Sequence, residues 1–287
     1  MKHFLLVDFG TTSTKSAVVD LDDGAFTVPE SYPALKNLSA RAGRCEFALA
    51  EVAERFASIC SAYYQRQPFD GIALCSEMHG FAVLDLDDQP LSNYISWKDE
   101  RSLEQGADKS AFEQITHLLG ERFKSITGMK PRPGFAPMNF TQLTRDGDLP
   151  PDVRIVDLPA WLCQTNNTTT KLTHPTMLAG LALYDVERQE TAREIVDAVF
   201  ELCGIRLRVD HAASAGQIAG YWRGNSVQIP IYVGIGDHQC SLLGAGLVAD
   251  NSLSINLGTG AQVSLLNRHK APAEAETRPY FSGQQLK

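Results

Sequence analysis

The first twenty residues contain the side chains best placed to do chemistry. An apolar run that ends at Asp8 is followed by Gly10 and by four consecutive hydroxyl residues, 11–14, before a second apolar run begins. We interpret this pattern as two strands joined by a tight loop, whose backbone N–H groups and hydroxyls can line a concavity for phosphate oxygens. Asp8 is placed to hold Mg²⁺, because this ion prefers one or two carboxylates together with phosphate oxygens and waters.

A second segment, residues 254–264, repeats the order of strand, loop and strand around Gly258, Thr259 and Gly260. Two such hairpins in one chain predict a nucleoside triphosphate held between two lobes. Each loop alone is also compatible with a polar turn, since Gly and Thr are common turn residues, and for the second loop alone we favour the turn. Neither loop has the glycine and lysine spacing of a Walker A motif.

Asp237 directly follows Gly236 in a third segment, residues 234–241, at the end of a predicted buried strand. One interpretation is an exposed carboxylate on a rigid support. The other is a helix N-cap, since Asp is a favoured capping residue. The segment alone leaves these two interpretations evenly balanced.

Two more segments follow predicted strands. Met78 and His79 lie directly after a strand, although an isolated His in such a loop is more often a structural hydrogen-bonding residue than a ligand. Trp97 offers an aromatic wall, with Asp99 and Arg101 as polar contacts, although a solvated charged loop is the simpler interpretation. Only the combination of these segments favours a site.

The elements that must position these residues alternate between strands and helices. The hydrophobic spacing predicts strands at 3–9, 15–21, about 25–32, 71–75, 81–85 and 231–236, and helices at 48–65, about 195–202 and 239–247. Residues 109–203 are predicted to be mainly helical, with a break at the proline-rich turn 130–134. This order predicts an α/β domain with a helical insertion.

Composition restricts the partners. The chain has 287 residues, 44% hydrophobic and 21% charged, with a net charge of -8, which is typical of a globular protein and disfavours nucleic acid or an anionic membrane surface. The six cysteines are widely spread without Cys-x-x-Cys pairs, which favours reduced thiols in a cytoplasmic protein. Asp8 interrupts the N-terminal apolar run, so we do not expect a signal peptide.

Taken in order, the motifs Asp-x-Gly-Thr-x-Ser-x-Lys, Met-His-Gly, Trp-x-Asp-x-Arg, Gly-x-Gly-Asp and a second Gly-Thr-Gly hairpin resemble the FGGY carbohydrate kinases, from residue 4 to about residue 266. Within that family the chain is most similar to the xylulokinase and sedoheptulokinase branch. The resemblance implies an actin-like, RNase H-like α/β fold with two lobes. It also implies a sugar in the cleft and ATP with Mg²⁺ bound chiefly by the second lobe.

The resemblance assigns roles position by position. Asp237 matches the catalytic base, and Asp8 matches the aspartate near Mg²⁺. The phosphate-binding positions are Gly10, Thr11, Thr12, Ser13 and Lys15 in the first loop, and Gly258, Thr259 and Gly260 in the second. The sugar-binding positions are Met78, His79, Trp97, Asp99 and His238, the last of which stands where xylulokinases usually carry Asn.

The expected reaction is transfer of the γ-phosphate of ATP to a hydroxyl of a ketose or polyol, resembling xylulose or sedoheptulose. The alternative is a non-catalytic sugar-binding or regulatory protein derived from such a kinase. The resemblance implies a sugar-binding lobe over 1–246 and the opening hairpin of the nucleotide lobe over 247–287. The chain alone is therefore expected to bind sugar weakly, bind ATP poorly and turn over negligibly. Its expected partners are the sugar and ATP, and a homodimer is an arrangement that these features allow.

Overall fold

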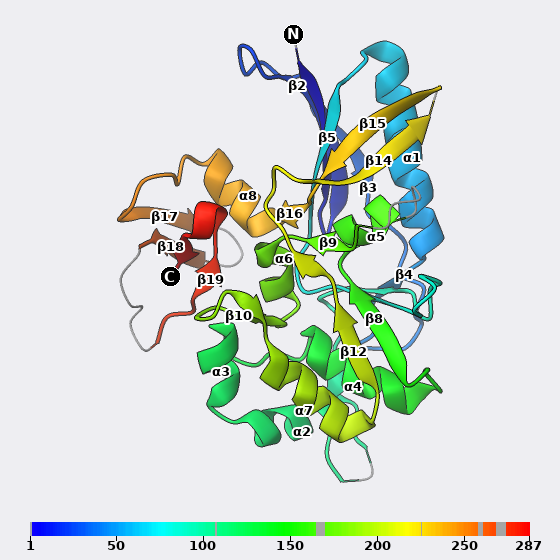
Figure 1. Ribbon diagram of the computed structural model, residues 1–287, viewed down its shortest axis with the longest axis vertical. Coiled ribbons are helices and arrows are strands. Elements are labelled where there is room, and N and C mark those ends of the chain that lie inside the picture. Colours follow the sequence, from blue (N-terminus) through cyan, green and yellow to red (C-terminus); the bar gives the residue numbers. More distant parts are fainter. Residues whose placement is uncertain (1, 107, 165–169, 225, 258–260, 268–273) are drawn as a thin grey trace.

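The computed structural model describes residues 2–106, 108–164, 170–224, 226–257, 261–267 and 274–287. Figure 1 shows a large sheet with the long helix α1 beside it, a mainly helical part below, and a small sheet to the left that contains the C-terminus. The described part of the chain thus forms three packed groups of elements, and the space between them positions the site.

The large sheet has seven described strands in the order β14-β15-β5-β1-β2-β3, with β16 paired to β5. Their bounds are β1 (His3–Phe9), β2 (Ser13–Asp20), β3 (Glu30–Pro33), β5 (Gly71–Ser76), β14 (Ile218–Gly224), β15 (Val227–Tyr232) and β16 (Ile235–Gly236). β1 lies near the centre, antiparallel to β2 and parallel to β5. Alternate residues of β1, Leu5, Val7 and Phe9, are buried, as the period of a strand requires.

Helix α1 (Leu49–Arg66) covers this sheet. Its predicted apolar face is confirmed, because Val52, Phe56, Ile59 and Tyr63 are all buried in the same core as the β1 side chains. The predicted strands at 3–9 and 71–75 and the tight turn after Phe9 are confirmed as well. The third strand is shorter than predicted and begins only at Glu30, with Phe26 joined to Val19 by an isolated bridge.

A second core lies in the mainly helical part, whose helices pack on a small sheet in the order β12-β8-β6. The helices of this core are α2 (Ala111–Leu119), α3 (Arg122–Thr127), α4 (Ala136–Asp146) and α7 (Arg193–Cys203). Helix α5 (Leu158–Gln164) packs in the core of the large sheet, and α6 (Pro175–Gly180) contributes Leu178 and Ala179 to a separate small cluster. The strands are β6 (Ala82–Leu84), β8 (Asp152–Val156) and β12 (Arg206–Val209). The helical prediction for 109–203 missed β8. A run of five residues is too short for its periodicity to distinguish a strand from a buried helix turn.

Short elements complete these two groups. They are β4 (Glu46–Phe47), β7 (Tyr94–Ile95), η1 (Arg101–Leu103), β9 (Leu172–Thr173), β10 (Tyr184–Asp185), β11 (Glu190–Thr191) and β13 (His211–Ala212). Capping agrees with the sequence: Ser110 and Glu113 form a capping box at the start of α2, and α7 ends before Gly204 as predicted.

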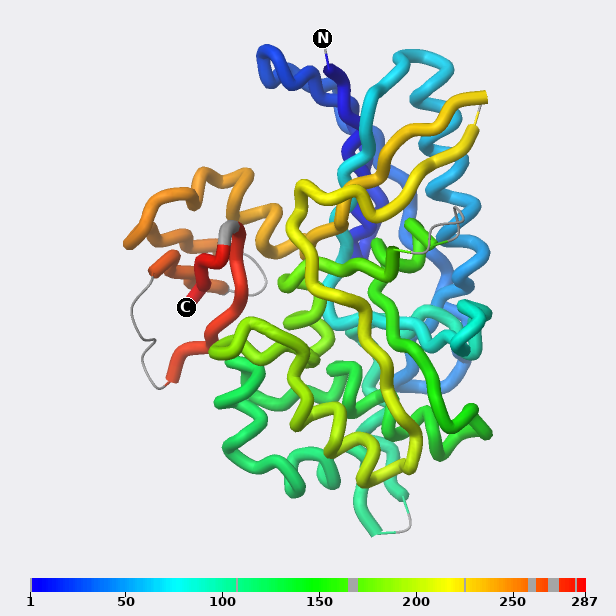
Figure 2. The backbone as a smooth tube through the Cα atoms, in the orientation of Figure 1, coloured from blue at the N-terminus to red at the C-terminus, as the bar shows by residue number. Residues whose placement is uncertain are grey.

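The third group begins with α8 (Asp237–Gly244), which starts two residues before the predicted 239. Its small sheet has the order β17-β18-β20-β19, with a core that includes Leu242, Leu266 and Tyr280. The elements are β17 (Ser252–Leu257), β18 (Ala261–Leu266), β19 (Arg278–Pro279), η2 (Phe281–Gly283) and β20 (Gln285–Leu286). Figure 2 shows the red C-terminal segment returning beside the yellow-green part of the chain. There the Val186 carbonyl accepts a hydrogen bond of 2.9 Å from Gln285 Nε2.

Candidate active site

Three loops meet at one edge of the large sheet. β1 and β16 are both parallel to β5, with Asp8 and Ile235 each paired to Cys75. Since the carboxyl ends of parallel strands lie at the same edge of a sheet, the chain leaves β1, β5 and β16 toward a common region. The predicted phosphate loop, the Met78 segment and the start of α8 are therefore brought together, although they are far apart in the sequence.

A cleft of about 950 Å³ lies between this edge and the small C-terminal sheet. Side chains from the predicted site form one wall: Thr11, Met78, His79, Trp97, Asp237 and His238. The other wall includes Arg132 from the proline-rich turn and, from segments after α8, Asn256, Gln262, Glu276, Arg278 and Lys287. The cleft is large enough for a sugar-sized ligand.

Asp237 is the first residue of α8, so its environment tests the N-cap interpretation. The N-cap position is Gly236, which has no side chain to cap with, and Asp237 Oδ1 instead accepts a hydrogen bond of 2.7 Å from the N–H of its neighbour His238. Burial raises the pKa of the Asp237 carboxyl to about 6, and the charge of Asp8 adds to the rise. A carboxylate that faces a cleft with a pKa near neutrality is suited to accept a proton.

Asp8 and the first loop form the opposite side of the same region. The Cys75 Sγ donates a hydrogen bond of 3.2 Å to Asp8 Oδ1, which leaves the rest of this half-buried carboxylate available to a ligand. Lys15 pairs with Asp8 across the β1–β2 ladder, so both side chains point to the same face. Gly10 and Thr12 lie in the turn itself, and Ser13 is the first residue of β2.

The Met78 segment places His79 in the cleft in one protonation state. The ring Nδ1 lies 2.5 Å from the Gly180 carbonyl oxygen. Since a carbonyl only accepts, Nδ1 carries the proton, and burial lowers the pKa of His79 to about 4. Nε2 is therefore an unprotonated acceptor near neutral pH. Met78 is buried and packs against Gly236. Because Gly236 has no Cβ, the Met78 Sδ can approach the Gly236 backbone closely.

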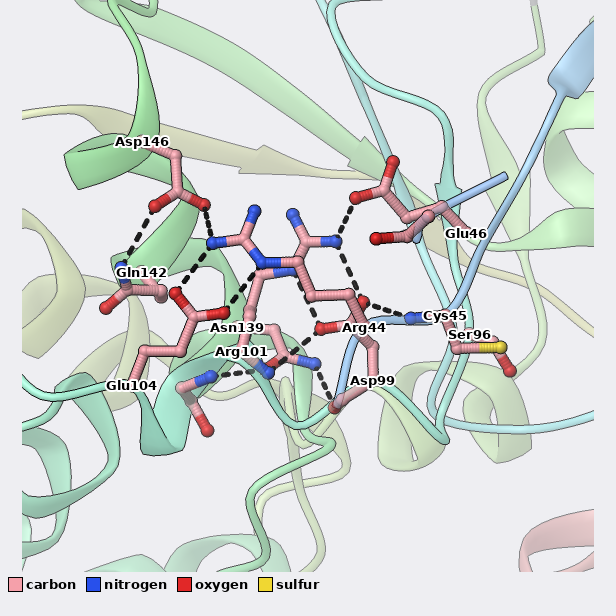
Figure 3. Close-up of polar contacts among 12 residues, drawn as sticks. Arg44, Cys45, Glu46, Ser96, Asp99, Arg101, Glu104, Asn139, Gln142 and Asp146 are labelled. Carbon is pink, nitrogen blue, oxygen red and sulfur yellow. Dashed lines mark hydrogen bonds and ion pairs between the residues drawn. The ribbon is translucent and has the colours of Figure 1, made fainter. Parts of the chain in front are cut away.

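Trp97 and Asp99 were predicted together, but the structure separates them. Trp97 is 43% exposed and lines the cleft, and its Nε1 donates a hydrogen bond of 2.8 Å to Thr11 Oγ1. Asp99 is 0% exposed and is not among the lining residues. Figure 3 shows it between Arg101 and Cys45: the Arg101 guanidinium binds both carboxylate oxygens at 2.8 Å, and the Cys45 N–H donates to Oδ2 at 2.8 Å. The prediction that Asp99 contacts a sugar is thus corrected to a structural ion pair.

The second hairpin faces the cleft from the other side. Gly258, Thr259 and Gly260 lie outside the described residues, but the strands that flank them, β17 and β18, pair in register. Gln262 Nε2 lies 3.1 Å from His238 Nε2. The amide nitrogen can only donate, so this His238 nitrogen accepts, and burial lowers the pKa of His238 to about 4. This contact joins α8 to the hairpin beside the predicted base.

Sequence reasoning missed a charged cluster on the far wall. Glu276 accepts hydrogen bonds from Arg132 at 2.8 Å, from Arg278 at 3.0 Å and from the Lys130 N–H at 3.1 Å. Arg132 lies in the proline-rich turn that was interpreted only as a helix break. Glu276 and Arg278 follow the second hairpin and have no motif around them. The sequence contains no signal that pairs residues 144 positions apart.

Among the described residues, no group of three or more His, Cys, Asp or Glu side chains could hold a metal ion, and no helix is long and apolar enough to cross a membrane. The charge of Asp8 raises the pKa of Asp237, so the two carboxylates lie near each other. Mg²⁺ at Asp8 stays a prediction, which the preference of this ion for one or two carboxylates with phosphate oxygens and waters allows.

Comparison with curated proteins finds xylulose kinases. The chain is 24% identical over 275 residues to the xylulose kinase of Bacillus subtilis, covering 92% of this chain and 53% of that protein. It is 27% identical over 211 residues to the xylulose kinase of Lactococcus lactis, covering 69% of this chain and 39% of that protein. The chain thus spans about half the length, or less, of these relatives.

Solved structures share the fold. A gluconate kinase from Lactobacillus acidophilus superposes with a TM-score of 0.81 at 19% identity, covering 99% of this chain and 58% of that one. A ligand-bound xylulose kinase from the same species gives 0.80 at 18% identity, covering 100% and 59%. Plasmodium falciparum glycerol kinase with ADP gives 0.80 at 15% identity, covering 100% and 60%. The actin-like fold implied by the motif order is confirmed. The family model "FGGY family of carbohydrate kinases, N-terminal domain" matches residues 3–244, so this chain belongs to the FGGY family of carbohydrate kinases.

Proposed function

We propose that the protein carrying this chain transfers the γ-phosphate of ATP to a hydroxyl of a ketose or polyol, and that residues 1–246 form its sugar-binding lobe. The observation that carries the proposal is the position of Asp237. Its carboxylate, with a pKa raised to about 6, lines the same cleft as Thr11 of the first phosphate loop and the side chains of His79 and Trp97. This arrangement supports a base that meets a sugar hydroxyl on one side and a phosphoryl group on the other.

In the proposed reaction, the sugar hydroxyl oxygen attacks the γ-phosphorus while its proton passes to Asp237. A new O–P bond forms, the bond from the γ-phosphorus to the bridging oxygen breaks, and ADP leaves with the bonding electron pair. Asp237 then releases the proton to solvent. Such transfers need mainly positioning and charge neutralisation, with little covalent participation by the protein.

The phosphate side of the proposal rests on Asp8, Lys15 and the backbone of residues 10–13. Asp8 would hold Mg²⁺, which when bound neutralises charge on the β- and γ-phosphate oxygens. Lys15, on the same face of the ladder, is placed to meet a phosphate oxygen. The second loop, Gly258 to Gly260, completes the phosphate site in this proposal.

On the sugar side, the acceptor Nε2 of His79 is suited to a hydroxyl donor, and the exposed indole of Trp97 to the apolar C–H face of a sugar. His238 lies next to the base in the same cleft. We propose a xylulose-like ketose as substrate because the curated relatives above are named xylulose kinases. The free cysteines support a cytoplasmic location, where ATP is available.

Coupled ADP release from the longest natural polypeptide that contains this chain tests the proposal. Ketoses and polyols, D-xylulose first, are screened with ATP and Mg²⁺, while calorimetry measures sugar binding to residues 1–287. Turnover with one sugar class supports a kinase. A folded protein that binds ATP and D-xylulose without turnover with any sugar would instead support the non-catalytic sugar-binding alternative.

A further inference from the structure

A hydrogen bond joins two loops of the cleft that carry different predicted roles. Trp97 Nε1 lies 2.8 Å from Thr11 Oγ1, across a sequence separation of 86 residues. Trp97 belongs to the sugar-facing wall, and Thr11 belongs to the first phosphate loop. The Thr11 side chain is therefore engaged by the sugar-facing wall of the cleft.

The chemistry of the two groups gives the bond a direction. An indole nitrogen only donates, so the Thr11 oxygen accepts and its own O–H is left to donate elsewhere. The acceptor beside it is Glu77, which is 4% exposed and lines the same small cavity of about 30 Å³. Burial raises the pKa of Glu77, whereas the hydroxyls of Ser96 and Thr11 lower it by hydrogen bonding.

Glu77 holds the Trp97 loop at a second point. Ser96, the residue before Trp97, donates a hydrogen bond of 2.8 Å from Oγ to Glu77 Oε1. The buried Glu77 carboxylate thus accepts a hydrogen bond from Ser96 of the loop, and it is linked to Trp97 of the same loop through the hydroxyl of Thr11. The backbone of Trp97 is also confined, since a Cβ at Gly134 would lie 2.2 Å from the Trp97 carbonyl oxygen.

We propose that Glu77 is a positioning residue, which holds the indole of Trp97 as the wall of the sugar subsite through the hydroxyl of Thr11. The sugar wall and the first phosphate loop then form one connected unit. A sugar that packs on Trp97 also orders Thr11, which favours ligand binding at the phosphate loop. By linkage, the ligand at the phosphate loop strengthens sugar binding by the same factor as the sugar strengthens binding of that ligand. The proposed function enters only in naming the ligand as a sugar.

The ligand-free test uses tryptophan fluorescence of residues 1–287. Trp161 and Trp222 are buried, so quenching by acrylamide reports mainly on Trp97. Thr11→Val removes the hydroxyl at nearly constant shape and is expected to increase quenching, as is Glu77→Gln. Thr11→Ser keeps the hydroxyl and is expected to restore the signal. Thr116→Val is the matched control, since it removes a threonine hydroxyl that donates to the Phe112 carbonyl within helix α2.

The binding test uses calorimetry with D-xylulose. Thr11→Val and Trp97→Phe, which keeps the aromatic ring, are each expected to weaken binding about 3- to 10-fold, the range of one net hydrogen bond. The double variant is expected to match the single variants, because both remove the same bond. Additive losses, or unchanged quenching in Thr11→Val, would overturn the proposal. If Glu77→Gln fails to fold, the comparison of Thr11→Val with Thr11→Ser in the quenching test still decides between the outcomes. The quenching arm needs no sugar, so its failure is independent of the proposed function.

Discussion

Arg101 binds Asp99 through two parallel hydrogen bonds of 2.8 Å, although the two residues are separated by one position and both are fully buried. Arg101 also reaches Glu46 at 2.5 Å, and Asp99 binds the Cys45 N–H. The pair therefore joins the strand β4 to the loop that carries Trp97, which makes its role structural.

Replacement of Arg101 should destabilise the fold strongly. Arg101→Met leaves the carboxylate of Asp99 buried without its partner, and such a loss typically costs about 3–5 kcal/mol of unfolding free energy. Urea denaturation measures it. Arg122→Met is the control, because Arg122 and Glu194 form an exposed pair at 3.4 Å that should contribute only about 0–1 kcal/mol. Equal effects of the two changes would contradict the structural role of the Asp99 pair.

Asp237→Asn should separate chemistry from capping. If Asp237 is the base, the rate falls by about 10²–10⁴-fold while sugar affinity changes little. Asn retains the shape and the acceptor toward the His238 N–H, so the melting temperature should stay near that of the wild type. Steady-state kinetics and a thermal melt give both values. A lower melting temperature with unchanged turnover would instead assign Asp237 to the helix terminus.

The pH profile should report the same carboxylate. Because burial raises the pKa of Asp237 to about 6, the free enzyme loses its base as pH falls through that value. We expect kcat/KM to decline about tenfold per pH unit below about 6. Sugar affinity should stay level over the same range, since burial keeps His79 and His238 neutral until about pH 4. A profile flat between pH 5 and 7 would argue against Asp237 as the proton acceptor.

Glu276 should hold the C-terminal segment against the helical part. It collects hydrogen bonds from Arg132, from Arg278 and from the Lys130 backbone, and the Thr277 N–H donates to the Gly128 carbonyl at 2.8 Å. Glu276→Ala is expected to speed proteolytic cleavage of residues 274–287 roughly tenfold, since a hydrogen bond to a charged group contributes about 1.5 kcal/mol or more. Gel electrophoresis of samples taken at intervals during proteolysis measures the cleavage rate. Glu274→Ala is the control, because Glu274 is exposed and lies 3.9 Å from Lys130; matching cleavage rates would reject the role of Glu276.

Much of the fold followed from local patterns. The buried face of α1, the strands β1 and β5, the turn after Phe9 and the end of α7 before Gly204 all agree with the prediction. Each depends on periodicity or on a terminating residue within a short window, which is information that the sequence contains directly. β8 and β14 were missed, because a short strand is recognised mainly by the neighbours with which it pairs.

The candidate site, like the fold, was only partly predictable from the sequence. Asp8 was favoured by its type and its position at a strand end, whereas His79 and Asp237 were favoured only by the order of the motifs and the family resemblance. Burial could not be read in this way, so Asp99 was expected in the cleft and Glu77 was overlooked beneath it. The cluster of Arg132, Glu276 and Arg278 depends on packing between segments 144 positions apart. Local order in the chain specifies strands and loops, whereas only the packing of those elements decides which charges lose water and which face the ligand.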